Sequence, residues 1–317
     1  MKIAYGINQI EIKRPTIVTL GIFDGLHLGH QKIMQLVVER AKATGFVPTV
    51  LTFSPHPRAV LHPQSAPPLL HTFEQKAEGL EILGIEQLVV LEFTRELASI
   101  SAEDFTRKIL YQGLEAKEVY LGQGFAFGRG REGNFEKLKE FSHRFDFFAD
   151  EVPEISLRTI RISSSKIRSL LISGQVNLAR RMLGRPYGVE GIVLEGRQLG
   201  RQIQFPTANL MPQNAVLPAN GVYVTLTLIE GVWRRSVTNV GIRPTFKDLQ
   251  DRLVESHILN FDGDLYGKTL RVRFLHRLRA EKKFASLDEL KKQISLDSNR
   301  AEKYFQHQIV GKVLKFV

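Results

Sequence analysis

The 317-residue chain contains no cysteine. Disulfides, thiolate metal sites and cysteine nucleophiles are therefore excluded, and the composition favours a cytoplasmic protein. No stretch approaches the roughly 18 consecutive apolar residues that a membrane-spanning helix requires. The first residues lack the apolar core of a secretory signal, so we expect no such signal. Internal repeats and low-complexity segments are also absent from the sequence, which argues against a repeat architecture.

Acidic residues are in deficit, with 33 Asp and Glu against 44 Lys and Arg, for a formal net charge of +11. A basic chain suits partners that carry phosphate, such as nucleic acid, anionic membranes or polyphosphate small molecules. The basic residues are dispersed, so small phosphate-bearing substrates are sufficient, and we expect neither nucleic acid nor membrane as a partner. A nucleic-acid-binding regulator is the alternative, but the expected strands do not interleave aromatic and basic residues as barrels that bind single strands do. Oligomeric state is left open.

The first half of the chain alternates expected strands and helices, which predicts a mostly parallel sheet with helices on both faces. The expected strands are Thr16–Leu20, Phe46–Phe53, Gln87–Glu92, Glu118–Leu121 and Phe145–Ala149. The expected helices are Gln31–Ala43, Thr72–Leu83, Ala102–Leu110, Phe135–Arg144, Ser163–Ile172 and Val176–Leu183. Ligands of such sheets bind outside the carboxyl ends of the strands.

The sequence pattern changes at Gly184, and we place a domain boundary there, between residues 1–184 and residues 185–317. Short apolar runs broken by Gly, Pro, Asn and Asp follow, and they predict a small β-barrel. These runs are Gly191–Leu194, Gly221–Leu228, Arg235–Val240, Glu255–Asn260 and Thr269–Phe274. Two amphipathic helices, Leu287–Ile294 and Arg300–Val310, are expected to end the chain. The fold class is therefore α/β followed by mainly β.

The most informative motif is G-I-F-D-G-L-H-L-G-H, which runs from Gly21 to His30 between an expected strand and an expected helix. A helix N-terminus offers free backbone N–H groups and a positive dipole end, and glycines allow close approach of a phosphate. We interpret His27 and His30 as catalytic donors that stabilise charge on an α-phosphate. The candidate nucleotide-binding residues of this motif are Gly21, Phe23, Asp24 and Gly29. The alternative is a strand–helix junction with one capping and one surface histidine.

A second phosphate signal is R-I-S-S-S-K-I-R, which ends at Arg168. Ser164 and Ser165 open an expected helix, so hydroxyls, backbone N–H groups and basic side chains together could hold a triphosphate. We assign the two serines to nucleotide binding and Arg168 to catalysis. A capped surface helix with solvated charges is the alternative.

Two aromatic segments follow expected strands: T-F-S-P-H-P, with Phe53 and His56, and G-F-A-F-G, with Phe125 and Phe127. Aromatic rings stack well on a flat heterocycle. We therefore interpret Phe125 and Phe127 as candidates for heterocycle binding, while proline fixes the loop that holds Phe53 and His56. Packing in the core is the more common role of such rings and remains the alternative.

The second half carries G-R-Q-I-Q-F-P-T-A-N, which begins with Gly200 and Arg201. Thr207 and Asn209 are two residues apart, so an extended segment places both side chains on one face. Such oxygen ligands, together with phosphate oxygens, suit Mg²⁺. Glu255 lies in an expected strand and is a candidate general base for a substrate hydroxyl. An ordinary loop and a surface-facing glutamate are the alternatives.

Together these segments resemble the bifunctional bacterial riboflavin kinase/FMN adenylyltransferase family over nearly the whole chain. The motifs that carry the resemblance are G-x-F-D-G-x-H-x-G-H at 21–30, T-F-x-P-H-P at 52–57, F-x-F-G at 125–128, I-S-S-S-x-I-R at 162–168, G-R-x-x-x-F-P-T-A-N at 200–209, N-V-G-x-R-P-T-F at 239–246 and E-S-H-x-x-x-F-x-G-D-L-Y-G at 255–267. The resemblance implies a Rossmann-like nucleotidyltransferase domain with a parallel sheet, followed by a small flavin-kinase β-barrel.

The resemblance also implies two activities: ATP-dependent phosphorylation of riboflavin to FMN by the second domain, and adenylylation of FMN to FAD by the first, with Mg²⁺ in both. It assigns flavin contacts to the four aromatic-segment residues, metal and nucleotide contacts to Thr207 and Asn209, and the base to Glu255. One departure is Gly124, where many relatives carry Asn or Asp, and we expect it to weaken FMN binding without abolishing adenylylation. The nearest alternative is a nucleotidyltransferase for another phosphate compound with the second half as an appendage, and the G-R-x-x-x-F-P-T-A-N segment argues against it.

Overall fold

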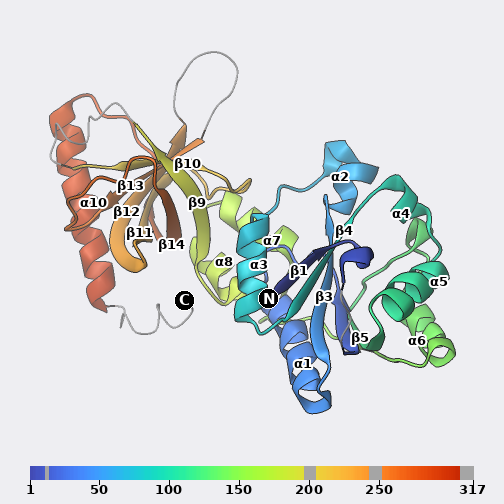
Figure 1. Cartoon of the computed structure of the whole chain (residues 1–317). Helices are drawn as coiled ribbons and strands as arrows, with labels where there is room; N and C mark the ends of the chain where they lie inside the picture. The colour runs from blue at the N-terminus through green and yellow to red at the C-terminus, as the bar shows by residue number, and fades with distance from the viewer. Residues whose placement is uncertain (11–13, 196–204, 243–251, 308–317) are drawn as a thin grey trace. The chain divides into compact units, whose positions relative to one another are not determined.

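The computed structural model describes residues 1–10, 14–195, 205–242 and 252–307 (Figure 1). Contacts divide the chain into two compact units, Met1–Ser163 and Ser164–Val317. This division differs from the boundary expected after Gly184, because helices α7 (Ser164–Ile172) and α8 (Val176–Leu183) are grouped with the second unit. Helix α8 packs on strands β9 and β14 of that unit, and the pattern of apolar and polar residues in the sequence does not reveal such a tertiary contact. Where the functional modules divide stays a prediction.

The first unit contains a six-stranded parallel sheet in the order β1-β4-β3-β2-β5-β6, which confirms the predicted class. Its strands are β1 (Lys2–Tyr5), β2 (Thr16–Leu20), β3 (Val47–Ser54), β4 (Gln87–Glu92), β5 (Ala116–Gly122) and β6 (Phe148–Val152). The sequence reading missed β1, a four-residue edge strand. It also began β6 too early, because Phe145 ends the preceding helix and Asp146 caps that helix in the left-handed conformation.

Helices cover both faces of this sheet, as Figure 1 shows. They are α1 (Leu28–Thr44), α2 (Pro57–Leu61), α3 (Phe73–Ile82), α4 (Arg95–Ser99), α5 (Ala102–Phe105) and α6 (Phe135–Phe145). Alternate residues of β2 enter different cores: Ile17 belongs to the same core as Met34 of α1, and Val18 belongs to the same core as Leu138 of α6. The expected helix 102–110 continues instead as a π-helical turn to Gly113, a change of hydrogen-bond register that side-chain spacing does not encode. A small hairpin, β7 (Ser156–Leu157) and β8 (Ile160–Arg161), completes the unit.

The second unit contains a closed antiparallel barrel in the order β10-β13-β12-β11-β14-β9, which confirms the predicted barrel. Its strands are β9 (Tyr187–Leu194), β10 (Ala208–Pro212), β11 (Gly221–Ile229), β12 (Val232–Ile242), β13 (Arg252–Ile258) and β14 (Thr269–Arg279). The expectation of two final helices was wrong, because α10 (Leu287–His307) is one continuous helix. Its polar middle stays helical because Asp297, near the centre, is buried in an ion pair with the barrel. Residues 308–310 of the expected second helix lie outside the described chain.

The alternation of side chains along the barrel strands decides which residues face the site. The barrel interior holds five buried hydroxyls joined by hydrogen bonds of 2.7–3.0 Å. They belong to Thr225, Thr227, Ser236, Thr238 and Ser256. Since Ser256 points inward, its neighbours Glu255 and His257 on β13 point outward. In the described part of the chain, no helix is long and apolar enough to cross a bilayer.

Candidate active sites

In the first unit, the two histidines lie side by side at the start of α1. His27 is the N-cap of the helix, and its Nδ1 accepts the backbone N–H of His30 at 3.4 Å. The two rings stack with centroids 3.6 Å apart and planes 20° apart. Because Nδ1 of His27 accepts, its neutral ring carries the proton on Nε2, where it can be donated. The structure therefore combines the predicted functional pair with the capping role that we weighed as the alternative.

Asp24 anchors this histidine loop. Its carboxylate is 3% exposed and accepts backbone N–H groups of Leu70, at 2.9 and 3.1 Å, and of His71, at 3.3 Å. Lys76 is buried nearby, and burial lowers the pKa of its ammonium while the charge of Asp24 opposes that shift. The carboxylate thus fixes the loop to the segment before α3, and a direct nucleotide contact by Asp24 stays a prediction.

The other loop residues named from the sequence shape the loop from within. Phe23 is buried, and its ring meets the His30 ring edge-on at 5.2 Å between centroids. A Cβ at Gly21 would lie 2.9 Å from the Phe23 ring, and a Cβ at Gly29 would lie 3.1 Å from Cε1 of His27. Both glycines therefore leave room for the aromatic side chains of the loop itself.

The three phenylalanines named from the aromatic segments belong to one core cluster. Phe53 and Phe127 are 9% and 6% exposed, and both rings lie near Phe105, at centroid distances of 6.4 and 5.5 Å. Phe125 is partly buried and lies nearly parallel to Phe127. His56 caps α2, and its Nδ1 accepts the Arg58 N–H at 3.0 Å. The structure thus brings the three phenylalanines together, and their contact with a flavin stays a prediction.

The serine-rich segment forms the first turns of α7. Arg168 donates from Nη1 to Oγ of Ser165 at 3.3 Å, and Ser164 is the first residue of the helix. These residues belong to the second compact unit, whereas the two histidines belong to the first. That both segments act on one nucleotide therefore stays a prediction.

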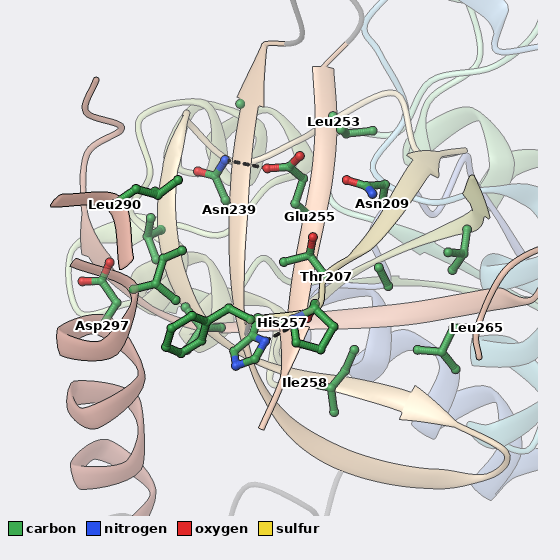
Figure 2. A pocket seen from close by; sticks show the side chains of 18 of the residues that line it. Thr207, Asn209, Asn239, Leu253, Glu255, His257, Ile258, Leu265, Leu290 and Asp297 are labelled. Atoms are coloured by element: carbon green, nitrogen blue, oxygen red, sulfur yellow. Dashed lines mark hydrogen bonds between the residues drawn. The ribbon is translucent and has the colours of Figure 1, made fainter. Parts of the chain in front are cut away.

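The second unit contains a cavity of about 490 Å³ on the outer wall of the barrel (Figure 2). One side is formed by β10, β13 and β12, and the other by residues 261–266, residues 279–284 and the first half of α10. Its lining mixes apolar side chains, such as Leu253, Leu265 and Leu290, with a few polar groups. This combination is typical of a site that binds a small molecule.

Three polar side chains form a row across the barrel wall of this cavity. Asn209 of β10 is the register partner of Glu255 on β13, which is in turn the partner of Asn239 on β12. Nδ2 of Asn239 donates to Oε2 of Glu255 at 3.3 Å, as the dashed line in Figure 2 shows. Thr207, two residues before Asn209, lines the same cavity. The structure therefore brings together three residues that the sequence named, while Gly200 and Arg201 lie outside the described residues.

Sequence reasoning assigned no role to several other polar residues of this cavity, among them Asn239 and His257. Asn239 opens the N-V-G motif, and its motif position was the available signal. His257 lies two residues after Glu255, and its Nδ1 is 2.9 Å from the carbonyl oxygen of Pro206. Burial lowers the pKa of the His257 imidazole, and the Pro206 carbonyl partly opposes that shift. The ring also meets the Phe205 ring edge-on, with centroids 5.3 Å apart.

Comparison with known proteins finds a matching family model in each half of the chain. A family model described as FAD synthetase matches residues 9–166, and one described as riboflavin kinase matches residues 183–305. Relatives named bifunctional riboflavin kinase/FMN adenylyltransferase include one from Pseudomonas fluorescens, 36% identical over 94% of this chain and 96% of its own length. One from Escherichia coli K12 is 33% identical over 96% of this chain and 98% of its own. The chain belongs to the bifunctional riboflavin kinase/FMN adenylyltransferase family.

A solved structure agrees with the fold assignment. A protein from Streptococcus pneumoniae, described as a macrolide-efflux protein, is 30% identical to this chain, with a TM-score of 0.87 over 95% of this chain and 98% of that one. The similarity covers both units. Because the riboflavin kinase model matches the second half, the alternative in which that half is a mere appendage is wrong for this family member.

The polar groups of the barrel cavity also fit a magnesium ion. Among the described residues, no group of three or more His, Cys, Asp and Glu could hold a metal by itself. Mg²⁺ in phosphoryl-transfer sites takes few protein ligands and keeps waters and substrate phosphates for the rest. The Thr207 hydroxyl and the Asn209 amide oxygen line one cavity beside the Glu255 carboxylate, and oxygen donors of this kind suit the ion.

A buried ion pair holds α10 against the barrel where the helix forms one wall of the cavity. Oδ2 of Asp297 accepts from Nη2 and Nε of Arg279, at 2.8 and 2.9 Å, and Gln293 donates to the other carboxylate oxygen at 3.0 Å. The side chains of Asp297 and Arg279 are 2% and 19% exposed. The pair thus fixes one wall of the cavity to another.

Replacing Asp297 by Asn is expected to lower the free energy of unfolding of the second unit by about 3 kcal/mol, because it leaves Arg279 partly buried without a counter-charge. The single tryptophan, Trp233, lies on β12 and reports this unit by fluorescence during chemical denaturation. Asp288→Asn, at an exposed position in the first turn of the same helix, is the control and should leave the midpoint unchanged. Equal midpoints for the two variants would show that the pair does not hold the helix.

Proposed function

We propose where in this chain each of the two family activities resides. Residues 185–317 phosphorylate riboflavin to FMN with ATP in the barrel cavity, and residues 1–184 adenylylate FMN to FAD and release pyrophosphate at the His27–His30 loop. The observation that carries the proposal is the Asn209–Glu255–Asn239 row, a carboxylate held by an amide inside a cavity of a riboflavin kinase domain.

In the kinase reaction, Glu255 accepts the proton of the riboflavin 5′-hydroxyl as that oxygen attacks the γ-phosphorus of ATP, whose bond to the bridging oxygen breaks so that ADP leaves. Asn239 holds Oε2 of the carboxylate, so the second oxygen is oriented toward the substrate. Thr207 and Asn209 hold Mg²⁺, which neutralises charge on the phosphates when bound. Gly200 and Arg201 contact the nucleotide.

In the adenylyl transfer, the FMN phosphate attacks the α-phosphorus of ATP. FMN is already anionic, so the step requires no general base. His27 and His30 donate hydrogen bonds to the α-phosphate oxygens, at a helix N-terminus that also favours negative charge. Arg168, Ser164 and Ser165 stabilise the leaving pyrophosphate. The flavin lies against the aromatic segments that contain Phe53, His56, Phe125 and Phe127.

A time course with purified protein, riboflavin, ATP and Mg²⁺ tests both halves of the proposal. Chromatography of the flavins should show FMN first and FAD later, because FMN is the substrate of the second step. FMN alone would support the kinase and direct attention to Gly124 or to a requirement for reduced flavin. If no flavin product forms, even with reduced flavin and added FMN, the proposal is wrong.

We further propose that small molecules are the partners of this chain, that nucleic acid is not one, and that it works in the cytoplasm. The net charge of +11 is then explained by the phosphate groups of the substrates. Strongly salt-dependent binding of RNA or DNA to the purified protein would contradict this view.

A further inference from the structure

His257 lies directly beside the chain that leads into β10. We infer that His257 is a positioning residue for riboflavin phosphorylation: its side chain fixes Phe205 and Pro206, and thereby sets the place of the Thr207 hydroxyl in the cavity. This inference rests on the proposed function of Thr207 as a ligand of the metal–nucleotide complex. It deepens that function by naming what holds the ligand in place.

The backbone around Thr207 gives the first reason. Pairing between β10 and β13 begins at Ala208, opposite Ser256, so Thr207 lies one residue before the described ladder. Pro206, one residue earlier, has no N–H with which to extend that ladder. The hydrogen bond from the His257 side chain to the Pro206 carbonyl therefore takes the place of a ladder hydrogen bond at this point.

The chemistry of the contact gives the second reason. A backbone carbonyl oxygen only accepts, so Nδ1 of His257 carries the proton and donates to Pro206 over 2.9 Å. The ring is also packed edge-on against Phe205. One side chain thus contacts two consecutive residues, and the next residue in the chain is Thr207.

The position of His257 on β13 gives the third reason. It lies two residues after Glu255, so both side chains project from the same face of one strand into the same cavity. Figure 2 shows His257 below Glu255, and the dashed line at its ring is the hydrogen bond to the Pro206 carbonyl. Strand β13 therefore carries Glu255, the proposed base, and through His257 it also holds the segment that contains Thr207. One strand thus sets the distance between Glu255 and Thr207.

Two substitutions separate the hydrogen bond from the packing. His257→Phe keeps a ring against Phe205 but removes the donor. His257→Asn loses the ring but places an amide N–H close to the position of Nδ1. We expect His257→Phe to raise the KM for the magnesium–ATP complex in riboflavin phosphorylation about tenfold, the usual scale for one lost hydrogen bond. The KM for riboflavin should stay within about twofold of that of the parent.

His257→Asn should restore the KM for magnesium–ATP to within about threefold of the parent value, because the donated hydrogen bond is kept. Adenylylation of added FMN, which we assign to residues 1–184 of the same molecule, serves as the internal control and should not change in either variant. Trp233 fluorescence during thermal unfolding confirms that the barrel is folded, and His257→Leu, which also lacks a donor, is the substitute if His257→Phe does not fold.

The inference is wrong if His257→Phe leaves the KM for magnesium–ATP unchanged, if His257→Asn is as defective as His257→Phe, or if the KM for riboflavin rises instead. Thr207→Ala, measured in parallel, tests the proposed function separately: an unchanged magnesium–ATP dependence there removes Thr207 as a ligand whatever His257 does. If Thr207 is a ligand, the double variant should be no worse than Thr207→Ala alone, since the two residues then act through one group.

Discussion

Replacing Glu255 by Gln is expected to lower the rate of riboflavin phosphorylation by roughly 10²- to 10⁴-fold, the range that general-base catalysis supplies. The amide keeps the size of the side chain and can still hydrogen-bond to Asn239, but it cannot accept the proton of the 5′-hydroxyl. The KM for riboflavin should change little, because the cavity walls remain in place. The measurement is the initial rate of FMN formation with saturating ATP and Mg²⁺.

Two controls make the Glu255 result specific. Glu230→Gln removes a carboxylate on the same barrel that is 74% exposed and paired with Lys268 outside the cavity, and it should leave the rate unchanged. Formation of FAD from added FMN should be normal in both variants. A Glu255→Gln protein that forms FMN at the parent rate would show that this carboxylate is not the base.

Replacing both His27 and His30 by Ala is expected to abolish FAD formation while sparing FMN formation. Loss of one preorganised donor to developing charge costs about 10²–10³ in rate, so loss of two stacked donors takes the reaction to the limit of detection. The measurement is FAD production from FMN and ATP, with riboflavin phosphorylation followed in the same sample. Near-normal FAD synthesis in the double variant would remove both histidines from the mechanism.

The capping role of His27 requires a separate control, because Ala at an N-cap also costs about 1 kcal/mol of stability. His27→Asn keeps an acceptor for the His30 N–H but loses the Nε2 donor, so it should fold normally and still be slow in FAD formation. His143→Ala, at an exposed position near the end of α6, should have no effect on either activity. Full activity in His27→Asn would indicate that the cap alone matters.

The sequence allowed the chemistry-bearing positions to be named because they are local patterns. A strand, a glycine-rich turn and a helix within thirty residues place His27 and His30 at a helix start, whatever the rest of the chain does. The two-residue spacing of Thr207 and Asn209 likewise puts both on one cavity wall. The parallel sheet and the barrel could likewise be predicted from the order and length of the apolar runs in the sequence.

Other features depended on contacts between distant segments. Asn239 and His257 acquire their roles through cross-strand register and through a carbonyl 51 residues away, and neither is visible in spacing. The continuous α10 exists because the Asp297 carboxylate meets Arg279 of β14, whereas the sequence alone showed a polar interruption. Grouping of α7 and α8 with the barrel likewise follows from packing.

The sequence by itself therefore determined most of the order of the elements, the fold class of each unit and several polar residues of the two sites, because hydrophobic periodicity and turn chemistry act over a few residues. Only the tertiary structure decided what each polar side chain contacts. Asp24 accepts hydrogen bonds from the backbone of residues 70 and 71, Asn239 donates one to Glu255, and His257 donates one to the Pro206 carbonyl. Hydrogen bonds require atoms within about 3 Å, and only the closed barrel and the packed sheet bring such distant parts of the chain together.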